Sequence, residues 1–60
     1  MNIPIERQIK CIDRELAIRK RVYPRWVDAE RMTQEDADDE IASMEAALET
    51  LKNIVQKPLL

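Results

Sequence analysis

The chain has no glycine, no histidine and no phenylalanine, and it has a single cysteine, Cys11. Without glycine few positions adopt a positive φ angle easily, which disfavours tight β-hairpins and sheets. One cysteine excludes an intrachain disulfide, and one cysteine without histidine excludes the common zinc ligand sets. No histidine is present to activate the thiol and no cofactor motif accompanies the carboxylates, so we expect no enzyme, no cofactor and no metal.

Long apolar runs are also missing, and the start Met-Asn-Ile-Pro lacks the layout of a signal peptide. An unpaired cysteine suits a reducing compartment, so we expect a cytoplasmic protein with no membrane partner. Sixty residues form at most one small domain, residues 1–60, at a size where a single core is marginal. Because disulfides and zinc are excluded, self-association is the remaining way to enlarge the core, and we expect a homodimer.

Apolar residues recur at helical spacing in both halves of the chain. The second half contains the stronger seam, with steps of 4, 3, 4, 3 and 4 residues: Ala37, Ile41, Met44, Leu48, Leu51 and Val55. The first half contains a looser one, which Arg19 interrupts: Ile5, Ile9, Ile12, Leu16 and Tyr23. This spacing keeps the apolar side chains on one side of each helix, facing a partner helix. The sequence therefore predicts an all-α protein, an antiparallel helical hairpin with helices near 5–23 and 33–56.

Proline and a capping sequence predict where these helices begin and end. Pro24 disfavours helical geometry at the residue before it, so we expect the first helix to end at Tyr23 or one residue earlier. Residues 24–32 then form the connection, with room for one short helical turn. Thr33 followed by acidic residues as far as Asp36 resembles a capping box and predicts the start of the second helix. Lys57-Pro58 closes that helix near Gln56.

A second apolar stripe on each helix predicts a further packing surface. Because each residue turns the helix by about 100°, the apolar positions of this second stripe lie to one side of the main seams. One stripe per helix is enough for a hairpin, so a second stripe favours a four-helix bundle formed by two copies. The expected dimer interface consists of Cys11, Ile18, Val22, Ala47 and Ile54.

Charge is divided unevenly along the chain. Residues 1–31 carry eight Lys/Arg and five Asp/Glu, whereas residues 32–60 carry two and seven. An antiparallel hairpin would place the basic half beside the acidic half, so internal pairing is one explanation and a partner-binding patch is the other. The acidic start of the second helix suits the helix dipole and does not have the spacing of a calcium-binding loop.

Both aromatic residues lie among basic residues near the middle of the chain. This candidate partner-binding site consists of Arg21, Tyr23, Arg25, Trp26 and Arg31. Aromatic rings and arginines anchor protein interfaces, and the same residues can stack on bases and bind phosphate. They can also close the end of the bundle, with the arginines paired to the acidic helix. These three interpretations remain open from the sequence.

Three segments resemble short uncharacterised proteins of temperate phages and prophages: Arg21-Val22-Tyr23-Pro24-Arg25-Trp26-Val27, Met32-Thr33-Gln34-Glu35-Asp36-Ala37-Asp38 and Glu40-Ile41-Ala42-Ser43-Met44-Glu45. The resemblance covers residues 5–51, and the Tyr-Pro-Arg-Trp element is its most specific part. The start of the second helix is more acidic here than in that pattern, so no basic site there is carried over. The resemblance implies a phage origin, a bacterial host cytoplasm and no particular activity.

Two functions fit a small helical dimer of this kind. In the first, the protein binds a host or phage protein and modulates it, as an inhibitor of a nuclease or defence factor does. In the second, it assists phage recombination or replication and touches nucleic acid through the Arg/Trp segment. The direction in which the basic residues point distinguishes the two functions.

Overall fold

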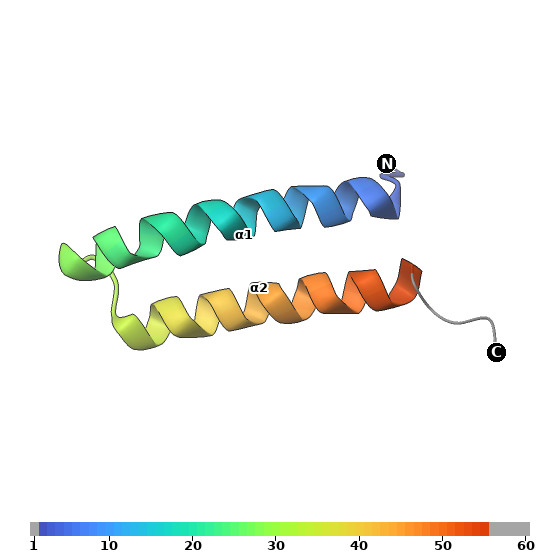
Figure 1. Ribbon diagram of the computed structural model, residues 1–60. Coiled ribbons are helices and arrows are strands. Elements are labelled where there is room, and N and C mark those ends of the chain that lie inside the picture. Colours follow the sequence, from blue (N-terminus) through green and yellow to red (C-terminus); the bar gives the residue numbers. More distant parts are fainter. Residues whose placement is uncertain (1, 56–60) are drawn as a thin grey trace.

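The computed structural model describes residues 2–55, which form two antiparallel α-helices (Figure 1). Helix α1 spans Ile5–Asp28 and helix α2 spans Gln34–Val55. Residues 29–33 connect them at one end, and the two helices then run side by side (Figure 1). The predicted helical hairpin is confirmed. Of the expected second helix, Gln56 lies outside the described residues.

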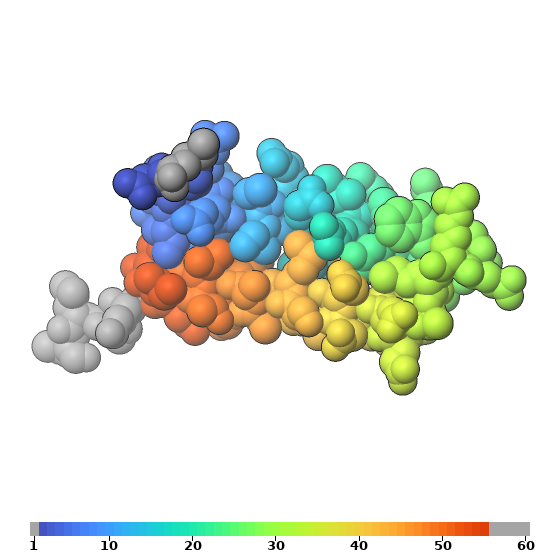
Figure 2. Space-filling model, turned by 180° about the vertical axis from the view of Figure 1, so that it is seen from behind, coloured from blue at the N-terminus to red at the C-terminus, as the bar shows by residue number. Residues whose placement is uncertain are grey.

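The core lies along the seams that the spacing predicts. Its four buried side chains are contributed by both helices: Leu16, Tyr23, Ala37 and Leu48. The other seam positions are half-buried, except Val55 at the end of α2, which is 43% exposed. The helices are in contact along their length (Figure 2). A single layer of two helices thus buries one narrow stripe on each and leaves the remaining sides uncovered.

Helix α1 continues through Pro24, so the expected end at Tyr23 is wrong. Proline has no backbone N–H and its ring opposes helical geometry in the preceding residue. Here Tyr23 is buried and Val27 is half-buried, so the turn that follows Pro24 packs on the core. This packing outweighs the local preference. The helical turn expected within residues 24–32 is the last turn of α1.

The end of α1 is fixed by two backbone hydrogen bonds. The Arg31 amide donates to the Trp26 carbonyl at 2.9 Å, and the Glu30 amide donates to the Val27 carbonyl at 3.0 Å. This is the Schellman pattern, which requires a residue in the left-handed conformation just past the helix. Glu30 takes that conformation with φ of 60°. A glycine-free chain thus makes its sharp turn with a glutamate.

Thr33 caps α2 as predicted. Its Oγ1 accepts a hydrogen bond from the Asp36 amide at 3.0 Å, and its carbonyl accepts one from the Ala37 amide at 3.0 Å. Glu35 and Asp36 lie in the first turn, where negative charge interacts favourably with the helix dipole. The second helix therefore begins at the residue that follows the cap.

Candidate functional site

Tyr23 joins the two helices at the end nearest the connection. Its side chain is buried at 6% exposure, and its hydroxyl donates a hydrogen bond to Glu40 Oε1 at 3.4 Å. The same hydroxyl accepts one from Arg19 Nη1 at 3.3 Å. Arg19, which interrupts the first seam, is in turn 3.7 Å from Glu40 and 3.4 Å from Glu15. The polar residue in the seam is thus accommodated by a cluster of four side chains.

Within this cluster, Arg19 carries a permanent positive charge. The hydrogen bond to Tyr23 raises the pKa of the Arg19 guanidinium above its ordinary value, and Glu15 adds to the effect. Arginine is already protonated throughout the physiological range, so the shift creates no switch near neutral pH. The distances are long and the charged side chains are about 40–50% exposed, so the cluster contributes little stability and mainly fixes orientation.

A second ion pair crosses between the helices on the other side of the hairpin. Lys20 Nζ lies 2.9 Å from Glu45 Oε2, and both side chains are half exposed. With the contact between Arg19 and Glu40, two basic residues of the first half of the chain lie close to acidic residues of the second half. The pairing predicted from the charge division is therefore present for Arg19 and Lys20.

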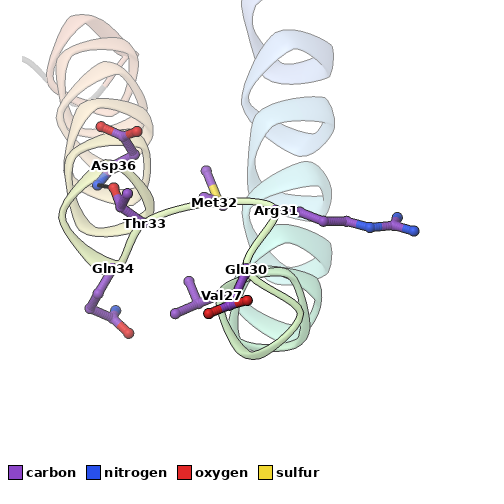
Figure 3. A pocket seen from close by; sticks show the side chains of 7 residues that line it. All are labelled: Val27, Glu30, Arg31, Met32, Thr33, Gln34 and Asp36. Carbon is purple, nitrogen blue, oxygen red and sulfur yellow. Dashed lines mark hydrogen bonds between the residues drawn. The ribbon is translucent and has the colours of Figure 1, made fainter.

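The three remaining arginines of the candidate site stay at the surface. Arg21, Arg25 and Arg31 are exposed, and no carboxylate of residues 2–55 lies within 4.0 Å of their charged groups. Arg31 extends from the connection away from both helices (Figure 3). Their positive charge is therefore available to a partner.

Trp26 is packed on one side and open on the other. Its ring centroid lies 5.6 Å from that of Tyr23, with the ring planes tilted by 36°. The side chain nevertheless remains 43% exposed. The expected site thus divides in two: Tyr23 is a core residue, and Trp26 with the three exposed arginines forms what we call the end surface.

The expected dimer residues share one side of the hairpin, which we call the open face. Rotation about the α1 axis, counted backwards from the seam, is roughly 100–140° for Cys11, Ile18 and Val22. The same backward rotation about the α2 axis is roughly 80–100° for Ala47 and Ile54. Because the helices are antiparallel, equal backward rotations point to the same side. Val22 is half-buried and the other four are exposed, with Ile18 at 36% and Ile54 at 59%.

Two shallow hollows run along α1 on this face. One, of about 380 Å³, is lined by Glu15, Ile18, Arg19, Val22, Tyr23 and Trp26. It joins the open face to the end surface, which the sequence analysis treated as separate sites. The other, of about 280 Å³, is lined by Ile3, Arg7, Gln8, Cys11 and Ile12. Sequence analysis gave Ile3 and Gln8 no role, although Gln8 Nε2 donates to the Ile3 carbonyl at 2.8 Å and so holds the lead-in against α1.

A third hollow, of about 490 Å³, lies at the connection (Figure 3). Its lining residues come from the last turn of α1, the connection and the first turn of α2: Val27, Glu30, Arg31, Met32, Thr33, Gln34 and Asp36. The Thr33 hydroxyl is already engaged by the capping hydrogen bond from the Asp36 backbone amide. The hollow offers no constellation for catalysis.

Within residues 2–55, no three His, Cys, Asp or Glu side chains come together as metal ligands. No helix in that range is long and apolar enough to cross a membrane. Comparison of the chain with protein families, with curated proteins and with solved structures finds no match in any of the three. The open face and the end surface are therefore the two candidates for a functional role.

Proposed function

We propose that this protein works by binding another protein, that it does so as a homodimer, and that it has no catalytic role. The open face forms the dimer, and the end surface contacts the partner. The observation that carries the proposal is a partly exposed apolar strip along α1, which runs from Ile18 through the half-buried Val22 to Trp26 beside a shallow hollow. Exposed apolar area of this kind in a small protein is typical of an interaction site.

The hairpin's single layer supports the homodimer. Domains normally bury their helices between at least two layers, yet only four side chains of residues 2–55 are buried here. The exposed residues Ile18 and Ile54 lie on the same face, so a second hairpin stacked there buries both. The result is the four-helix bundle that the two stripes predict.

A matched pair of substitutions tests the dimer. Ile18→Glu introduces a charge into the open face and is expected to shift the protein from dimer to monomer in sedimentation velocity at micromolar concentration. Ala17→Glu, at the exposed neighbouring position on another side of α1, is expected to leave the dimer intact. A folded wild-type monomer at 100 µM would overturn the proposal.

The end surface supports binding to an acidic protein surface. Trp26 presents a half-exposed aromatic ring, and Arg21, Arg25 and Arg31, near the same end of the hairpin, have no carboxylate of residues 2–55 within 4.0 Å. Tryptophan and arginine are the residues that most often dominate binding energy at interfaces. In line with the phage resemblance, the proposed partner is a bacterial host or phage protein, such as a nuclease or defence factor that the dimer modulates.

Trp26→Ala tests the partner contact. Because the ring is half exposed, its loss is expected to cost less than the roughly 3–5 kcal/mol typical of a buried aromatic residue, so the variant stays folded. Capture of a bacterial protein by the immobilised chain is then expected to be lost, in lysate with and without nuclease. Ala42→Ser, at an exposed position on α2, serves as the control and retains capture.

The same experiment decides the alternative, an accessory role on nucleic acid. The exposed arginines can bind phosphate, but the ion pairs of Arg19 and Lys20 reduce the free positive charge near the end surface. If nuclease treatment abolishes capture, the nucleic-acid function replaces the one proposed here.

A further inference from the structure

We propose that the two copies cover the open face in one specific way: α1 of each copy packs on α2 of the other, and both connections lie at the same end. This inference rests on the proposed homodimer and specifies its geometry. Two identical faces related by a two-fold axis can be stacked with that axis either parallel or perpendicular to the helices. The parallel axis places α1 on α2 of the partner, whereas the perpendicular axis places α1 on α1.

Charge favours the parallel axis. Four exposed arginines follow the outer edge of α1, at spacings of 7, 7 and 4 residues that keep them on one side of the helix: Arg7, Arg14, Arg21 and Arg25. None of them has a carboxylate of residues 2–55 within 4.0 Å. Stacking α1 on α1 would place two such rows beside each other, and like charges across an interface are unfavourable. Stacking α1 on the acidic α2 places the last of these arginines, Arg25, beside Asp36 and Asp39.

The register of the hairpin supports the same arrangement. Lys20 contacts Glu45, and Tyr23 and Arg19 both contact Glu40, so the paired residue numbers add to 65, 63 and 59. Residues of α1 and α2 therefore lie at about the same height when their numbers add to roughly 62. Rotation about an axis parallel to the helices leaves height unchanged. Ile18 therefore lies within one helical turn of Ala47 of the partner subunit, and Cys11 lies within one helical turn of Ile54 of the partner subunit.

The same register places the basic end of α1 beside the acidic start of α2. Arg25 lies within one helical turn of both Asp36 and Asp39 of the partner subunit. Its long side chain reaches across such a turn. Because both connections share one end, Trp26 and Arg31 of the two copies are also brought to that end. The dimer then presents two copies of the partner contact side by side.

A charge exchange tests this arrangement. One variant carries Arg25→Glu, and the other carries Asp36→Lys and Asp39→Lys. Each variant alone places like charges at both symmetry-related contacts of its own interface, so its homodimer is expected to weaken roughly tenfold or more. Mixed together, the two variants restore opposite charges at both contacts and are expected to form a heterodimer, read out by native mass spectrometry.

Two controls keep the outcomes separate. Lys10→Glu and Asp38→Lys change charge at exposed positions away from the open face, and each is expected to retain its homodimer. Circular dichroism checks that every variant is helical. A wild-type dimer whose charge-exchanged variants do not prefer each other overturns the arrangement and leaves the proposed dimer standing. A wild-type monomer overturns both.

Discussion

Tyr23→Ala is expected to unfold the protein at 25 °C. Tyr23 is one of four buried side chains among residues 2–55, and replacing a buried aromatic residue by alanine typically costs about 3–5 kcal/mol. A core in a chain of this length rarely supplies more than about 3–5 kcal/mol in total. The loss is therefore comparable to the whole stability. Far-UV circular dichroism of the variant should show little helix.

Tyr23→Phe separates the ring from its hydroxyl. It keeps the buried ring and removes the hydrogen bonds to Glu40 and Arg19, which are long at 3.4 and 3.3 Å. A net loss near the lower end of the usual range of about 0.5–1.5 kcal/mol is expected, and the variant stays folded. Urea denaturation at one fixed protein concentration measures both variants, since dimer formation makes stability depend on concentration. A folded Tyr23→Ala variant within 1 kcal/mol of the wild type would contradict the central role of this ring.

Pro24→Ala is expected to stabilise the protein by about 1–3 kcal/mol, because proline inside a helix costs about 3 kcal/mol relative to alanine. Alanine restores the amide that donates to the Lys20 carbonyl one turn earlier. Lys10→Ala, at an exposed α1 position, is the control and is expected to change stability by less than about 0.5 kcal/mol.

Helix content gives the Pro24 experiment a second readout. Since α1 already extends to Asp28, Pro24→Ala should raise the urea midpoint with almost no gain in helical signal. A large gain in helical signal would instead mean that the helix of the wild-type protein stops before Pro24. Stability and helix content together therefore distinguish the observed helix end from the one that the proline predicts.

The sequence predicted the parts of this fold that depend on periodicity and on local hydrogen bonds. The two seams identified both helices, and Thr33 identified the start of the second one, because spacing and capping are local properties of the chain. The end of the first helix was predicted wrongly. The steric effect of Pro24 is local, but the packing of Tyr23 and Val27 that overrides it comes from the other helix. Glu30 gave no signal, since a positive φ is normally announced by glycine or asparagine.

The candidate site was predicted in part for similar reasons. The residue types around Trp26 indicated a binding surface, but burial decides which of them face solvent. The sequence placed Tyr23 both on the α1 seam and among the candidate binding residues, and its burial assigns it to the seam. Arg19 was recognised as an interruption of the seam, whereas its contacts with Glu15 and Glu40 depend on rotamers and on the register between helices.

The left-handed turn at Glu30 has a consequence for how two chains can exchange helices. From Arg25 to Lys57 the chain contains neither glycine nor proline, and the connecting residues Ala29, Glu30, Arg31 and Met32 are all good helix formers. Holding Glu30 at φ of 60° costs about 1–2 kcal/mol that a helical conformation there would not. The buried core and the helix caps therefore hold the hairpin closed, although the connecting residues themselves favour a continuous helix. When the core is weakened, the two helices can join into one long rod, and two such rods can re-form the same contacts between chains as a domain-swapped dimer.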